Sequence, residues 1–186
     1  MADEREVRRE VVEVARELLR SGAVIGTLGN VSARRGDGFI VTPTRRDYRA
    51  LQSEELVVID EAGNASGGEP SLEWQLHAAA YAAGPEVGGV VHTHSPHATA
   101  WSFLGEELLP ELEDNAYYRT GPIRTAALAV GGSAELAVAA TEVLRGSRAA
   151  LLAGHGVVAT GATAGEAAVI AAVVERQAQV AWLLRR

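Results

Sequence analysis

Three histidines in two apolar segments are the residues of this chain best suited to hold a metal ion. His92 and His94 follow the hydrophobic run 87–91, and His155 lies between two glycines after residues 149–153. If run 87–91 is a strand, alternation places His92 and His94 on one face, while the glycines let the backbone beside His155 crowd a site. Neutral imidazole suits zinc and its neighbours, and three protein nitrogens leave a coordination position open for water or substrate. The pattern predicts a catalytic metal centre.

The roles of the other two histidines, His97 and His77, stay open. A single histidine beside an apolar strand is more often a partly buried core side chain, so the prediction depends on three such residues together. His97 is a candidate fourth ligand or a residue that positions the site, although Ser95-Pro96 bends the chain away from strand geometry. His77 lies in an apolar predicted helix, which places it in the core or behind the ligands. A purely structural zinc site is disfavoured because the chain has no cysteine.

Glu73 follows Pro70-Ser71-Leu72 near the start of a predicted helix, and two interpretations of it stay open. Its carboxylate can be an ordinary helix-start acid, stabilised by free N–H groups and the helix dipole. Alternatively, it is a general base that lies over the metal and transfers a proton beside a metal-bound carbonyl. Sequence spacing does not separate the two.

Small hydroxyl and amide side chains recur beside glycines and helix starts, at Thr27, Asn30, Ser32, Thr44 and Ser71. Such segments can bind phosphate without lysine, because backbone N–H groups and hydroxyls converge on it. They are equally typical of simple turns.

Composition limits the class of protein. With 186 residues, 47% hydrophobic and 22% charged, the chain is expected to be one ordered domain over residues 1–186. A net charge of −7 with no basic stripe argues against a nucleic-acid partner. No uninterrupted apolar stretch approaches the roughly 20 residues of a membrane span, and the acidic N-terminus is unlike a secretory signal. Together with the absence of cysteine, this favours a cytoplasmic location.

The expected elements mix helices and strands without strict alternation. Helices are expected over 3–20, 70–83, 96–103, 133–144 and 163–184, and strands over 38–42, 56–60, 88–94, 149–153 and 157–160. Segments 26–32 and 107–119 are expected as loops or, for the second, a surface hairpin. This order favours a layered α/β domain with a mixed or antiparallel sheet.

Taken in order, five segments resemble the class II aldolase/adducin-head family, whose enzymes include L-fuculose-1-phosphate aldolase and L-ribulose-5-phosphate 4-epimerase. They are Gly26–Ser32, Ile40–Thr44, Pro70–Trp74, Val91–His94 and Gly154–Gly156. The resemblance runs from about residue 5 to the C-terminus. It implies a three-layer α/β/α fold around a mixed, largely antiparallel sheet. It also implies a homotetramer with active sites between subunits.

The resemblance assigns zinc to His92, His94 and His155 and the acid/base role to Glu73. It assigns phosphate binding to Thr27, Asn30, Thr44 and Ser71. The implied reaction is cleavage of a small, phosphorylated ketose, in which zinc stabilises the charge of an enediolate. Epimerase, dehydratase and decarboxylase activities begin with the same chelated carbonyl and stay open.

The chain departs from the fuculose-phosphate aldolases at its candidate substrate pocket. Leu72 replaces a serine of their Ser-Ser-Glu, and Arg45 replaces a glycine after Thr-Pro-Thr. Arg45 either crowds the pocket or supplies a replacement positive charge. These changes leave the zinc chemistry expected and put the identity of the sugar phosphate in question.

The catalytic tyrosine of those relatives, given across the subunit interface, follows a proline that matches Pro110. The matching position here is about Asp114, with Tyr117 and Tyr118 close behind, so these two are the candidate phenols. The chain ends at Arg186 without the longer tail of some relatives.

Two non-aldolase classes are alternatives. The first is a non-catalytic interaction module like the adducin heads, which keep the scaffold without the metal. The presence of all three candidate ligands argues against this class. The second is a cupin-like dioxygenase, which needs a β-barrel that the long terminal helices contradict.

Overall fold

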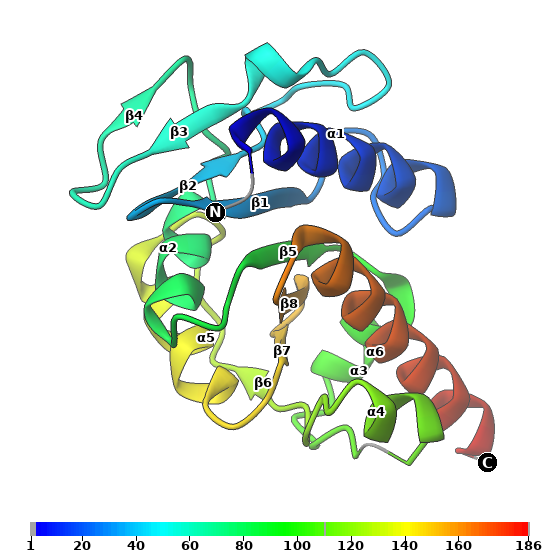
Figure 1. The fold of residues 1–186 in the computed structure, drawn as a ribbon. Coiled ribbons are helices and arrows are strands. Elements are labelled where there is room, and N and C mark those ends of the chain that lie inside the picture. Colours follow the sequence, from blue (N-terminus) through cyan, green and yellow to red (C-terminus); the bar gives the residue numbers. More distant parts are fainter. Residues whose placement is uncertain (1–2, 110, 186) are drawn as a thin grey trace.

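The computed structural model describes residues 3–109 and 111–185, and within them eight strands form one sheet (Figure 1). The strands are β1 Asn30–Arg35, β2 Gly38–Val41, β3 Val57–Ile59, β4 Ala65–Ser66, β5 Gly89–Thr93, β6 Thr125–Ala126, β7 Ala149–Leu152 and β8 Gly156–Gly161. Their order is β4-β3-β2-β1-β5-β8-β7-β6. All neighbours are antiparallel except β6 and β7, which confirms the mixed, largely antiparallel sheet.

Helices cover both faces of this sheet and make three layers. They are α1 Glu4–Ser21, the 3-10 helix Ser53–Glu55, α2 Trp74–Ala82, α3 Pro96–Ser102, α4 Glu113–Tyr117, α5 Ala134–Leu144 and α6 Ala164–Leu184. One core cluster joins the sheet to α1, α3 and α6, and a second joins it to α2 and α5. Consecutive residues such as Val90 and Val91 enter opposite clusters, because strand side chains alternate between faces. The expected α/β/α fold is confirmed.

The structure contains three strands that were not expected, β1, β4 and β6, and it differs from the expectation in three segments. The expected loop 26–32 ends early, because β1 begins at Asn30, where it pairs with β5. Helix α2 begins at Trp74, not at Pro70, since Pro70 bridges to Pro43 beside the sheet. The expected loop 107–119 contains the short helix α4. Pro110 lies outside the described residues.

Helix α6 is the one helix in the described part of the chain whose length and apolar composition would suffice to cross a membrane. Glu166, Glu175 and Arg176 interrupt its apolar sequence. One side of the helix, with Ile170 and Val174, is buried in the core against the sheet. This packing accounts for its composition. The Thr163 side chain caps the first turn by accepting a hydrogen bond from the Glu166 N–H.

Candidate metal centre

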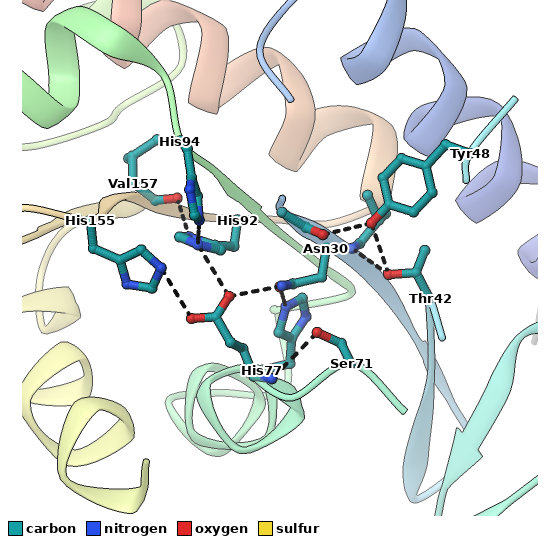
Figure 2. Close-up of polar contacts among 12 residues, drawn as sticks. Asn30, Thr42, Tyr48, Ser71, His77, His92, His94, His155 and Val157 are labelled. Carbon is teal, nitrogen blue, oxygen red and sulfur yellow. Dashed lines mark hydrogen bonds and ion pairs between the residues drawn. The ribbon is translucent and has the colours of Figure 1, made fainter. Parts of the chain in front are cut away.

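Strand β5 and the β7–β8 turn bring three histidines together. His92 is in β5, His94 lies just beyond its end, and His155 lies in the turn before β8, which pairs with β5. The three rings have pairwise centroid distances of 4.7 to 4.8 Å, and Figure 2 shows them converging. The glycines beside His155 are required: Gly154 has a φ of +62°, and a Cβ on Gly156 would lie 2.1 Å from the Thr93 carbonyl oxygen.

Glu73 joins this group, and one candidate ligand atom from each of the four residues lies within 4.8 Å of the others. Its Oε2 lies 3.2 Å from His92 Nε2, and its Oε1 lies 3.5 Å from His155 Nε2. The Nε2 atoms of His92 and His94 are 3.0 Å apart.

These residues fit a divalent metal ion. His92 Nδ1 donates a hydrogen bond to the Val157 carbonyl oxygen at 3.0 Å, so that its Nε2 presents a lone pair to the centre of the group. A backbone carbonyl behind a ligating imidazole is the usual way to fix the ligand tautomer. Glu73 Oε1 is buried without a hydrogen-bond partner, which is costly unless a cation or a substrate group satisfies it.

Burial sets the charge state of the histidines. Desolvation lowers the pKa of His92, and it lowers the pKa of His94 to about 4. Both rings are therefore neutral at neutral pH, which is the form that binds a metal.

The side chain of Glu73 makes no hydrogen bond to the N-terminus of α2, although Glu73 is the residue before that helix. It faces the histidines instead, which favours the interpretation as a site residue over that as a helix-start acid. Burial raises the pKa of Glu73, but the nearby His92 and a hydrogen bond from Asn30 outweigh this, and the pKa lies below its ordinary value of 4.5. Glu73 is therefore a carboxylate at neutral pH.

A cavity of about 340 Å³ opens beside the histidines, and all four residues expected to bind phosphate line it. Those four are Thr27, Asn30, Thr44 and Ser71. The Asn30 side chain is engaged on both ends, since it donates to Glu73 Oε2 at 2.9 Å and accepts from His77 Nε2. Ser71 Oγ accepts the Glu73 N–H at 3.3 Å, which leaves its own hydroxyl proton free to donate.

Arg45 and Leu72, the positions at which the resemblance predicts departures from the fuculose-phosphate aldolases, also line this cavity. Arg45 has a φ of +54°, in the left-handed region that favours glycine. Leu72 is 60% exposed. Together with Thr27 and Thr44, these residues form what we call the rim of the cavity.

The candidate tyrosines do not reach the cavity within one chain. Tyr117 ends α4 and is 79% exposed, and its ring packs against that of Tyr118. Neither residue lines the cavity. His97 also points elsewhere, because its Nδ1 pairs with Glu175 at 2.7 Å; it is not a fourth ligand in this arrangement.

Sequence reasoning missed two features of the site. Gly131 lines the cavity, and a Cβ there would lie 3.4 Å from His155 Cε1 and 3.8 Å from Glu73 Oε1. A hydrogen-bonded group behind Glu73 includes His77, Ser32 and Tyr81. The i, i+4 spacing of His77 and Tyr81 on α2 was a usable signal for the second feature; their shared partner Ser32 was not.

The fold and this site define a class of protein. Residues 9–182 match the model of the class II aldolase and adducin N-terminal domain family, and the chain belongs to that family. It is an enzyme of the class II aldolase type.

Individual members of the family are similar to this chain over most of its length. A 5-methylthioribulose-1-phosphate/5-deoxyribulose-1-phosphate aldolase of Rhodospirillum rubrum is 37% identical over 177 residues, or 95% of this chain and 80% of the relative. An L-fuculose phosphate aldolase of Escherichia coli K12 is 35% identical over 92% of this chain and 80% of the relative. A solved L-fuculose 1-phosphate aldolase superposes with a TM-score of 0.90 at 30% identity, over 98% of this chain and 87% of that one.

Proposed function

We propose that this chain is a zinc-dependent aldolase that cleaves a small phosphorylated ketose. The observation that supports this most strongly is the group of His92, His94, His155 and Glu73 at the edge of a cavity lined by hydroxyl side chains. The relatives at 37% and 35% identity are named for sugar 1-phosphate or sugar phosphate substrates, which agrees with an anion site in that cavity.

In this proposal His92, His94 and His155 hold the ion, and Glu73 is the acid/base residue. The ion, when bound, supplies a Lewis acid that stabilises negative charge developing on the substrate carbonyl oxygen. Cleavage breaks one carbon–carbon bond: the hydroxyl of the aldehyde fragment loses its proton through a base to solvent, and the carbon of the ketone fragment gains a proton. Glu73 starts as a carboxylate, so its Oε1, the oxygen without a hydrogen-bond partner, first takes up a proton from solvent and then delivers it to that carbon, which balances the proton lost from the hydroxyl.

The rim and the segment before α2 hold the phosphate. The Thr27, Thr44 and Ser71 hydroxyls donate to it, with Asn30 beside them at the start of β1. Arg45 supplies the positive charge.

The proposed assembly is a homotetramer of single-domain chains in the cytoplasm. Tyr117 or Tyr118 of a second copy then provides the phenol that exchanges a proton with the leaving alkoxide. Their exposed position on α4 leaves them accessible to a second copy.

A substrate panel tests the function. Zinc-loaded protein is offered ketose 1-phosphates, including fuculose, deoxyribulose and methylthioribulose phosphates, and the same sugars without phosphate. The proposal expects aldehyde and dihydroxyacetone phosphate to be released in equal amounts, with no turnover of the free sugars and none after chelation. Absence of release from every ketose phosphate contradicts it. Conversion without cleavage identifies an epimerase, dehydratase or decarboxylase on the same scaffold.

A further inference from the structure

A chain of buried hydrogen bonds runs behind Glu73, from helix α2 through strand β1. Tyr81 Oη lies 2.8 Å from Ser32 Oγ, which lies 2.6 Å from His77 Nδ1. On the other side of the ring, His77 Nε2 lies 2.5 Å from Asn30 Oδ1, and Asn30 Nδ2 donates to Glu73 Oε2. We call these five residues the relay. Each is at most 8% exposed, and Figure 2 shows the ring of His77 next to Asn30.

The direction of every hydrogen bond in the relay follows from the charge of Glu73. A carboxylate only accepts, so the Asn30 atom facing it is the NH2 group and the carbonyl oxygen faces His77. His77 Nε2 must then carry the ring proton. Burial lowers the pKa of His77 to about 3, so the ring is neutral and its Nδ1 accepts the Ser32 hydroxyl.

Because of the relay, the two carboxylate oxygens of Glu73 differ in their hydrogen-bond partners. Oε2 accepts from Asn30 at 2.9 Å and faces His92. Oε1 has no hydrogen-bond partner and lies toward His155 and Gly131, on the cavity side. A proton placed on Oε2 would oppose the N–H of Asn30, whereas Oε1 is free to take one.

We propose that His77 is a positioning residue, which fixes the amide of Asn30 so that it holds Oε2 of Glu73 and leaves Oε1 as the oxygen that exchanges a proton with substrate. The proposal rests on the proposed function only in giving Glu73 the acid/base role. It goes beyond that function in assigning one tautomer of a buried histidine, outside the group of candidate ligands, to the catalytic geometry. Without His77, the Asn30 amide is free to turn its carbonyl oxygen toward the carboxylate.

The tautomer can be observed without any activity measurement. In zinc-loaded protein labelled with ¹⁵N at histidine, long-range ¹H–¹⁵N correlation spectra at pH 7 separate protonated from unprotonated ring nitrogens. His77→Gln identifies the His77 signals by their loss. The proposal expects a proton on Nε2 and none on Nδ1. A proton on Nδ1, or on both nitrogens, overturns it whether or not the substrate panel succeeds.

Kinetics on a cleaved substrate separate positioning from support of the fold. His77→Leu removes both hydrogen bonds of the ring, whereas His77→Gln keeps an N–H for Asn30 and a carbonyl oxygen for Ser32. The leucine variant should lose about tenfold or more in kcat, with KM and zinc content nearly unchanged, and glutamine should restore most of the loss. Thr160→Val, which removes a buried hydrogen bond to the Arg148 carbonyl oxygen near the far end of β8, is the control.

Two kinetic results contradict the positioning role. One is an equal loss in the leucine and glutamine variants, and the other is a kcat in Thr160→Val as low as in His77→Leu. If His77→Leu does not fold, His77→Gln and the tautomer measurement still decide the proposal. If the wild-type protein cleaves no ketose phosphate, the proposed function fails, and the tautomer alone decides whether the relay has the stated direction.

Discussion

The relay and the rim meet at the same cavity but are built in opposite ways. In the relay, side chains from β1 and α2 satisfy one another in the core, with Ser32 and His77 fully buried. In the rim, Arg45 and Leu72 are exposed and come from connecting segments. Arg45 and Leu72, the positions at which the resemblance predicts departures from the fuculose-phosphate aldolases, both fall in the rim. In the proposed function, the residues that move the proton are therefore held by the core of the fold, whereas the residues that select the substrate lie in loops.

The tyrosine segment extends this contrast. Glu73 and the three histidines meet within one chain, but Tyr117 and Tyr118 lie on α4, away from the cavity. In our proposal, the part of the site that acts on the carbonyl is therefore complete in a single chain. The part that acts on the leaving alkoxide depends, in our proposal, on a second copy.

The largest effect is expected when one of the three candidate metal ligands is removed. His94→Ala should lose bound zinc and at least about a thousandfold in kcat/KM together, because only two imidazoles are then left to hold the ion. Metal content by mass spectrometry and turnover are measured on the same sample. His97→Ala is the matched control, since His97 pairs with Glu175 outside the group. Zinc retained in full by His94→Ala would show that this ring is not a ligand.

Glu73→Gln separates holding the metal from moving the proton. The amide keeps the shape of the side chain but has no basic oxygen, so kcat should fall by about a hundredfold to ten-thousandfold. Most of the zinc should stay bound to the three histidines. Full activity in this variant would remove Glu73 from the acid/base role.

The relay also predicts how stability depends on pH. The pKa of His77 is held by burial at about 3 in the folded chain, against about 6.5 when it is exposed. Between these values the unfolded chain binds a proton that the folded chain does not. The free energy of unfolding must therefore fall as pH falls from about 6.5 toward 3, by up to about 1.4 kcal/mol per pH unit from this residue.

His77→Gln removes that contribution. In urea titrations of chelated protein at pH 6.5, 5.5 and 4.5, the variant should lose stability less steeply than the wild type. The difference between the slopes should be up to about 1.4 kcal/mol per pH unit. Equal slopes would mean that His77 is charged in the folded chain.

The smallest expected effect concerns the rim. Arg45→Gly should raise the KM for a phosphorylated substrate and the Ki for inorganic phosphate by about tenfold, because one charged contact to the anion is lost. The same change should stabilise the fold by about 1 kcal/mol, since Arg45 has a left-handed backbone. Arg46→Gly is the control, because Arg46 pairs with Glu55. An unchanged Ki in Arg45→Gly would exclude Arg45 from the anion site.

Much of the fold could be predicted from local sequence. The elements that were not predicted depend on contacts between segments or are too short to leave a pattern. The ends of α6 and α1 followed from Thr163 and Gly22 as caps. The start of β1 at Asn30 did not, because it is decided by the pairing of Asn30 with His92 in β5, which is far along the chain. The two-residue strands β4 and β6 are edges too short to leave a pattern.

The features of the candidate site also divide into those that local sequence predicts and those that only the packing of distant segments creates. The His-x-His spacing and the glycines around His155 indicated the meeting of the three rings. The role of His77 was left open, because its partners Ser32 and Asn30 lie more than forty residues away and are brought to it only by the packing of α2 on the sheet.

The zinc site is tested most directly by an anomalous difference map at the zinc edge, from crystals of the isolated protein loaded with zinc. We expect one strong peak per chain, about 2.0–2.1 Å from a nitrogen of each of His92, His94 and His155, with the cavity open on its remaining side. A map with no peak among these rings, or with zinc bound only elsewhere on the chain, would contradict this expectation.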